Sequence, residues 1–211
     1  MIPKSMNKTP NKIIAASFLA CLILMPFRGY ARAFDFKDVA EIGIAYLTHL
    51  GFHEVGHQLV ADEVGADSHK INFFISKNGK FYPGLSLYKS IPEESRLPYA
   101  LGGERMAGLT FEYALQSYRR QPTMFNKSLM FFSCVDFLGY TLLANYVYPE
   151  NDMLDPNLIR AETGLSKEML LSMVTARTLM NAYRVINKDA NFSPMILLDK
   201  KSATFAVRFE F

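Results

Sequence analysis

The segment 38–64 has apolar residues at regular spacing and no proline, which predicts one long helix that ends before Gly65. Two further helices are predicted over 99–120, which is followed by Gln121-Pro122, and over 166–186, where an apolar stripe recurs at helical spacing. These segments make up much of the chain, so the pattern predicts a mainly α fold.

Two other segments have the pattern of strands. Residues 70–88 contain short apolar runs on either side of Asn78-Gly79, a dipeptide typical of the tight turn in a β-hairpin. Residues 204–211 alternate apolar with other positions, which predicts a half-buried strand. We therefore expect a helical bundle with a small β-hairpin and a C-terminal strand.

The segment 128–148 is the most apolar part of the chain after the N-terminal region, and Asp136 is its one charged residue. Its length of about 21 residues is enough to cross a bilayer. The same composition is typical of a central helix that is buried on all sides. The sequence leaves both interpretations open, and it predicts that the next segment, 150–156, is an acidic loop.

The N-terminal region has the order of an export signal. Three lysines precede the apolar run 13–27, and small residues follow up to Ala33. The run is about 15 residues long, shorter than the roughly 20 residues of a transmembrane helix. We therefore expect that 1–33 is a cleaved export signal and that 34–211 is a single domain, exported to the cell envelope as a periplasmic or membrane-associated protein.

The charge balance bears on the partner that the domain would bind. The whole chain has 23 basic and 20 acidic residues, but five of the basic and none of the acidic ones fall within 1–33. Residues 34–211 therefore carry 18 basic and 20 acidic residues, a net charge of −2. This balance argues against a nucleic-acid partner. Cys134 would be the one cysteine of the mature domain, so no internal disulfide is expected.

The sequence His53-Glu54-Val55-Gly56-His57 lies inside the predicted helix 38–64. Histidines four residues apart lie on one face of a helix, so both imidazoles can reach one zinc ion while Glu54 projects beside them as a general base. His49 extends the same row, but it would lie about 12 Å from His57 along the helix axis, too far to share the ion. The motif predicts a zinc site with His53 and His57 as ligands.

A catalytic zinc site needs a third protein ligand and leaves the fourth position to water. Glu104 lies 47 residues after His57, near the start of the predicted helix 99–120. Asp152 and Asp155 follow the apolar segment 128–148. Asp136, inside that segment, could be a ligand, a proton relay or a capped core acid. The residues alone leave this choice open.

The motif and its continuation, His53 to Ala61 followed by Gly65-Ala66, resemble the zinc helix of site-2-protease-type metalloproteases. The small residues Gly102, Gly103, Ala107 and Gly108 are similar to a helix of that family. The resemblance covers about residues 45–156 and implies a third ligand at or after a later apolar helix, which favours Asp152, then Asp155, over Glu104. Neither aspartate is followed by the glycine of that family's motif.

The fold expected on this basis is a helical zinc-metalloprotease-like bundle. Its function would be that of an exported or membrane-associated zinc metallopeptidase, with Zn²⁺ as cofactor and a peptide or protein as substrate. A membrane contact through 128–148 would fit the same interpretation. The alternative is a non-catalytic envelope protein whose metal helix is structural or vestigial and which binds a protein partner, for instance by strand addition.

Overall fold

The computed structural model describes residues 35–77 and 79–209, so the predicted export signal at 1–33 lies outside the described residues. The fold is mainly helical with two antiparallel β-hairpins, which confirms the predicted class. The helices and strands are, in chain order, α2 (Phe36–Glu63), β1 (Lys70–Lys77), β2 (Lys80–Leu87), the 3-10 helix η2 (Glu93–Ser95), α3 (Arg96–Arg120), α4 (Met124–Leu142), the π-helix η3 (Leu143–Val147), α5 (Asp155–Thr163), α6 (Lys167–Ile186), β3 (Phe192–Leu198) and β4 (Ala203–Phe209).

Helix α2 and the hairpin that follows it agree with the sequence pattern. The side chain of Asp35 accepts a hydrogen bond from the Asp38 N–H, and the Asp38 side chain accepts one from the Asp35 N–H, which completes a capping box at the start of α2. Gly65 follows the helix with a φ of 66°, and Gly79 has a φ of 71° in the turn between β1 and β2. Glycine adopts this left-handed conformation without steric cost, so both breaks fall where they were predicted.

The structure differs from the sequence prediction in several places. The helix predicted over 99–120 begins three residues earlier, at Arg96. The C-terminal strand pairs with a second strand, β3, which the alternation rule missed because its sequence, Phe-Ser-Pro-Met-Ile-Leu-Leu, has no period of two. The predicted loop 150–156 is a loop only in part, since its last two residues begin α5. The apolar segment 128–148 begins earlier, at Met124, because the Thr123 side chain accepts a hydrogen bond from the Asn126 N–H, and it ends in the π-helix η3.

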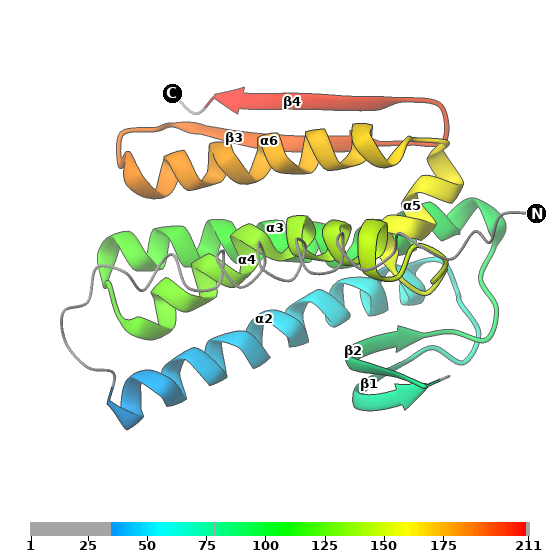
Figure 1. Cartoon of the computed structure of the whole chain (residues 1–211), viewed down its shortest axis with the longest axis horizontal. Helices are drawn as coiled ribbons and strands as arrows, with labels where there is room; N and C mark the ends of the chain where they lie inside the picture. Colours follow the sequence, from blue (N-terminus) through cyan, green and yellow to red (C-terminus); the bar gives the residue numbers. More distant parts are fainter. Residues whose placement is uncertain (1–34, 78, 210–211) are drawn as a thin grey trace, which may run out of the picture.

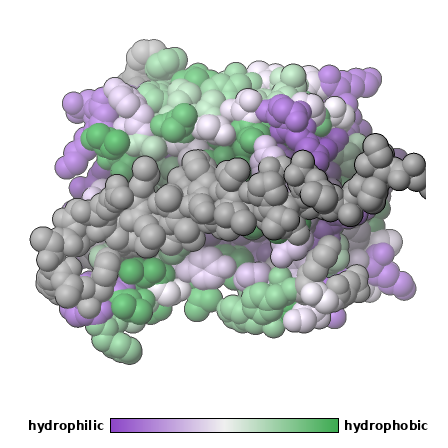
Figure 2. Space-filling model, in the orientation of Figure 1, coloured by the Kyte–Doolittle hydropathy of each residue, from purple (hydrophilic) through white to green (hydrophobic). Residues whose placement is uncertain are grey.

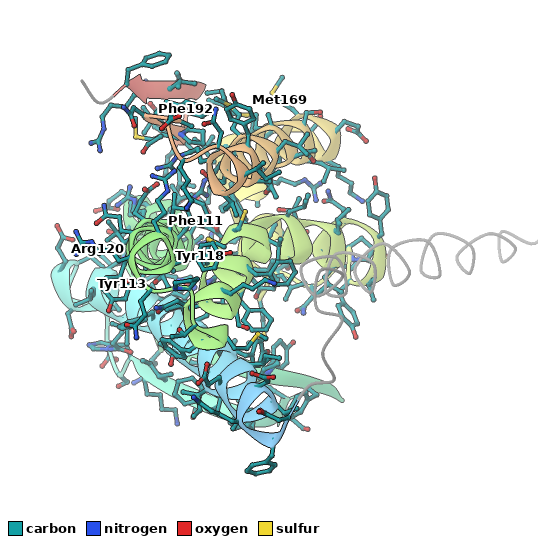
Figure 3. All side chains as sticks on the ribbon, turned by 90° about the vertical axis from the view of Figure 1, so that its left-hand side faces the viewer. Phe111, Tyr113, Tyr118, Arg120, Met169 and Phe192 are labelled. Carbon is teal, nitrogen blue, oxygen red and sulfur yellow. The ribbon has the colours of Figure 1, made fainter. Side chains whose placement is uncertain are left out.

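The helices form successive layers, as Figure 1 shows. Helix α2 packs against both α3 and α4, α6 packs against α4 on the opposite side, and β3 packs against α6. Figure 3, turned by 90°, shows the same order, with Phe192 of β3 lying against α6. The Phe192 ring stacks on Tyr183 of α6, with ring centroids 6.2 Å apart. The hairpin β1–β2 lies beside the C-terminal half of α2.

Helix α4 lies between α2, α3 and α6 and contributes to two buried clusters. Phe137 and Leu138 pack with residues of α3, α5 and α6, and Leu129 and Met130 pack with residues of α2 and α3. The stretch Met124–Val147 is the one described helix long and apolar enough to cross a membrane, and 56% of its most apolar window is buried in the molecule. Length and composition of this kind also occur in the core helix of a soluble protein.

The molecule also exposes large apolar side chains. Figure 2 shows apolar residues over the layer of α6, β3 and β4 and also near α2 and the β1–β2 hairpin. On α2 the exposed apolar residues include Ile44, Leu47 and Leu59, which are between 50% and 57% exposed. Exposed apolar surface of this kind is typical of contacts with proteins or membranes.

Candidate metal centre

The candidate site lies where α2 crosses α3, and two glycines allow the helices to approach closely. A Cβ atom added to Gly56 would lie 2.8 Å from the carbonyl carbon of Gly102, and one added to Gly102 would lie 2.5 Å from the Gly56 oxygen. Contacts this short do not occur for real side chains, so only glycine fits at either position. The close crossing brings the histidines of α2 against α3.

Three buried side chains converge at this crossing. His53 Nε2 and His57 Nε2 are 3.2 Å apart. Asp155 Oδ2 lies 3.4 Å from the His53 nitrogen and 3.2 Å from the His57 nitrogen. His53, His57 and Asp155 are each less than 9% exposed. The three ligand atoms thus form a nearly equilateral triangle, in which Asp155 is contributed by the first residue of α5.

The other nitrogen of each histidine has a partner that orients the ring. His57 Nδ1 lies 2.7 Å from the backbone oxygen of Tyr99, and His53 Nδ1 lies 2.9 Å from Asp136 Oδ2. Since both partners only accept hydrogen bonds, both Nδ1 atoms are assigned as donors. In a neutral ring with its proton on Nδ1, Nε2 carries a lone pair and accepts hydrogen bonds. His53 Nε2, His57 Nε2 and the Asp155 carboxylate are then three acceptors in contact with no donor among them. Such a cluster requires a cation or a proton.

The spacing of these atoms fits a zinc ion. Zinc binds nitrogen and carboxylate oxygen at about 2.0–2.2 Å, and two ligands of a tetrahedron with such bonds lie about 3.3–3.5 Å apart. The three observed separations are 3.2, 3.2 and 3.4 Å. With two histidines and one carboxylate the donor set is also one that catalytic zinc sites use, since it leaves the fourth position open.

Gly103 of α3 lies directly against Nε2 of His53 and Nε2 of His57. A Cβ atom added there would lie 2.6 Å from His57 Nε2 and would come closer still to His53 Nε2. Any residue other than glycine would therefore compete for the space in front of the histidines. The small residues of 102–108, singled out by the resemblance, thus include one that lies at the site and one that lies at the helix crossing.

Glu54 is buried beside this group and faces strand β2. A Cβ atom added to Gly84 would lie 2.5 Å from Glu54 Oε1, so the glycine leaves room for the carboxylate. Burial raises the pKa of Glu54, while the neighbouring His53 and His57 work against this rise. A carboxyl group whose pKa is raised toward neutrality is suited to accept and release protons.

The surrounding carboxylates favour positive charge at the histidines. Burial alone would lower the pKa of His53, but the carboxylates of Asp136, Asp155 and Glu104 together outweigh burial and raise this pKa well above its usual range. His57 shows the same balance between burial and Asp155, with a net raised pKa. Burial would raise the pKa of Asp155, but the two histidines lower it overall. The site therefore attracts a cation electrostatically.

The remaining candidates lie at different distances from this group. Asp152 is exposed and is not part of it, although it lines an adjoining cavity. Glu104 is buried behind His53, where it forms a second cluster with His53 and Asp136 rather than joining Asp155. Burial raises the pKa of Glu104 well above its usual range, and Arg177 lies 4.0 Å from its carboxylate.

Asp136 joins two histidines of α2. Besides its contact with His53, its Oδ1 lies 3.1 Å from Nε2 of the buried His49. His49 is therefore connected to His53 through Asp136 and is not part of the group formed by His53, His57 and Asp155. Sequence reasoning had named Asp136 with three alternative roles, and in the structure it orients His53.

Glu54 is a lining residue of two cavities. The smaller, about 150 Å³, also contains His57 and Asp155, and the larger, about 380 Å³, also contains His53 and Asp136. Strand β2 runs along both: residues 81–84 line the larger cavity and residues 84–87 line the smaller one. The lining residues that sequence reasoning missed are those of β2 and Tyr140, which lines both cavities and which no local motif distinguished from other apolar positions.

Comparison with family models, with curated proteins and with solved structures finds no match to this chain. The case for a function therefore depends on the geometry of the site.

Proposed function

We propose that this protein is a zinc-dependent metallopeptidase in which His53, His57 and Asp155 hold the ion and Glu54 is the general base. The observation that carries the proposal is the convergence of three buried ligand atoms, 3.2–3.4 Å apart, next to a buried glutamate. Asp155 takes the place of Asp152 as the preferred third ligand because its carboxylate approaches both histidine nitrogens.

The residues around the ion have the roles that peptide hydrolysis requires. Zinc in such a site supplies a Lewis acid and lowers the pKa of water to about 7. Glu54 accepts the proton of the attacking water and passes it to the leaving amine. Tyr140 lines both cavities beside Glu54, so its hydroxyl is the candidate donor to the carbonyl oxygen of the substrate.

The arrangement of the cavities supports a peptide as the substrate. Successive parts of β2 line the two cavities and both have Glu54 in their lining, so an extended chain along β2 would place one peptide bond at the carboxylate and its neighbouring side chains toward the two cavities. In the described sheets β2 pairs with β1 on one edge only, which leaves its other edge for strand addition. A small substrate would not need two cavities in line.

We also propose, from the resemblance of the histidine motif and its continuation, that the protein is related to site-2-protease-type metalloproteases. The proposal also includes export and a location at the cell envelope, based on the sequence of residues 1–33. The apolar helix Met124–Val147 and the exposed apolar residues of α2 would suit a membrane-associated enzyme.

The first experiment tests the metal. Zinc per chain would be measured by elemental analysis for the full-length protein and for His57→Ala, Asp155→Ala, Asp152→Ala and Glu104→Ala. We expect one zinc ion in the parent, in Asp152→Ala and in Glu104→Ala, and loss of the ion in the other two variants. Asp152→Ala is the matched control, because it removes the same side chain three residues away. A folded parent without zinc, even after reconstitution, would refute the proposal.

The second experiment tests catalysis. The zinc-loaded parent and its Glu54→Gln variant would be incubated with a mixture of unstructured peptides, and new termini would be identified by mass spectrometry. We expect cleavage by the parent and at least a hundredfold slower cleavage by Glu54→Gln, with zinc content unchanged, because the variant lacks the proton acceptor. Zinc binding without any cleavage would instead favour a structural metal site in a protein that binds a partner.

A further inference from the structure

The larger cavity differs from the smaller one in chemistry as well as in size. Its walls are formed by apolar and aromatic side chains of α2, β2 and α4 and of the segment after α4. The residues that carry this character are Leu50, Phe81, Phe131, Phe132, Val135 and Leu154. No lysine or arginine is among its described lining residues.

The acidic and basic groups that line this cavity are His49, His53, Glu54 and Asp136. His49 and His53 both contact Asp136, and Glu54 also lines the smaller cavity. These groups already have partners or a proposed role in the site. A charged side chain that entered the cavity would therefore lose its hydration without gaining an ion pair with a residue of its walls.

The cavities on the two sides of Glu54 differ in size. A cavity of about 380 Å³ lies within the range of pockets that bind organic ligands, whereas the one of about 150 Å³ lies below it. Strand β2 leads from one to the other past Gly84, opposite Glu54. A peptide bond placed at Glu54 therefore has a large apolar cavity on one side and a small one on the other.

We propose that this protein recognises its substrate through a bulky apolar side chain, Leu, Met or Phe, next to the scissile bond, which enters the cavity lined by Phe81, Phe132 and Val135. This inference rests on the proposed function for the position of the scissile bond. The occupant is a peptide side chain rather than a separate ligand because the candidate catalytic group Glu54 is one of the lining residues of this cavity and because β2, which has a free edge in the described sheets, also lines it.

A peptide-binding experiment tests this preference for an apolar side chain without requiring catalysis. The zinc-loaded, full-length Glu54→Gln protein would be immobilised and exposed to a random peptide mixture, and the retained peptides would be sequenced. We expect at least about tenfold enrichment of Leu, Met and Phe over Ala at one position of the aligned peptides, since each methylene that fills an apolar pocket contributes about that factor. Asp, Glu and Lys should be depleted at the same position.

Two further variants test whether the larger cavity causes the enrichment of apolar residues. In the same background, Val135→Phe adds a ring to its wall and should remove the enrichment of Phe, while Phe81→Ala widens it and should admit larger side chains. Phe81 is 62% exposed, so its replacement leaves the core intact. Val39→Phe is the matched control, because it makes the same substitution at an exposed position that lines neither cavity.

The outcomes separate this inference from the proposed function. Retained peptides without apolar enrichment, or no retained peptides, would overturn the inference whether or not the parent cleaves peptides. The same enrichment in Val135→Phe and Phe81→Ala as in their background would also overturn it. Apolar enrichment without cleavage by the parent would support the inference and refute catalysis. Recovery of one fatty acyl chain per protein from the parent, and not from Val135→Phe, would assign the cavity to a lipid and overturn the inference.

Discussion

Replacing Gly103 with alanine should weaken zinc binding at least a hundredfold without unfolding the protein. The added Cβ atom would lie 2.6 Å from His57 Nε2, whereas an ordinary contact begins at 3.4 Å, so the imidazole would have to move by about 0.8 Å. Zinc sites tolerate about 0.2 Å in ligand distance. Loss of an indirect partner of a zinc ligand already lowers metal affinity 10–100-fold. We therefore expect at least a hundredfold loss, or about 2.8 kcal/mol at 1.4 kcal/mol per tenfold.

The assay is competition for zinc with a chromophoric chelator, combined with circular dichroism of the metal-free protein. Gly51→Ala is the control: it makes the same substitution on α2, where an added Cβ has no atom within 4 Å. Alanine is more favourable than glycine in a helix by about 0.8–1.0 kcal/mol, so this variant should bind zinc normally and melt at a higher temperature.

Zinc binding by a folded Gly103→Ala variant within threefold of the parent would refute the proposed position of the ion. Loss of the helical signal from the metal-free variant would also contradict the argument, because it would assign this glycine to helix packing rather than to the metal site.

Three other predictions concern the groups behind the site and the fold. Asp136→Asn should lower zinc affinity about 10–100-fold by chelator competition, because a neutral amide orients His53 less strongly; an affinity equal to that of the parent would rule out this role. The pKa values of His53 and His57 are raised in the folded state, so protonation of these histidines stabilises the metal-free protein, fully below about pH 6.5. This stabilisation should be lost as the pH rises through the raised pKa values, and the zinc affinity should increase over the same range. Thermal melts with chelator and with zinc between pH 5 and 9 would test this, and melting temperatures independent of pH would contradict it. Glu112→Ala removes both oxygens that accept from the buried Arg184, at 2.6 and 2.7 Å, and should cost about 2 kcal/mol in denaturant unfolding, with zinc content unchanged; a loss below 0.5 kcal/mol would show that the ion pair adds little.

The sequence predicted the parts of the site that depend on local geometry. His53 and His57 share a face of α2 because residues four apart always do in a helix, and the motif fixes Glu54 between them. The same reasoning excluded His49 from the ion by distance along the axis, and in the structure His49 contacts Asp136 instead. These conclusions needed no knowledge of how the helices pack.

The third ligand could not be chosen in the same way, because it depends on packing between distant segments. Asp152 and Asp155 lie three residues apart in one polar segment, and nothing local shows which one turns inward. In the structure Asp155 is the first residue of α5, which packs on α3, while Asp152 lies in the preceding turn and is exposed. A carboxylate 98 residues after His57 reaches the site only through the arrangement of α3, α4 and α5.

The glycines connect the fold with the chemistry. Gly56 and Gly102 allow α2 and α3 to cross at contact distance, Gly103 leaves space in front of the histidine nitrogens, and Gly84 leaves space for Glu54. Glycine lowers helix stability, so its presence in the middle of α2 and near the start of α3 is unfavourable for the isolated helices and is explained by the close approach that it allows. Of the described glycines that leave too little room for a Cβ atom, Gly56 and Gly102 lie at the crossing, and Gly103 and Gly84 lie against side chains of the candidate site, while Gly108 lies against the end of the Arg177 side chain. These glycines therefore mark where the packing of α2, α3 and β2 around His53, His57 and Glu54 depends on the absence of a side chain.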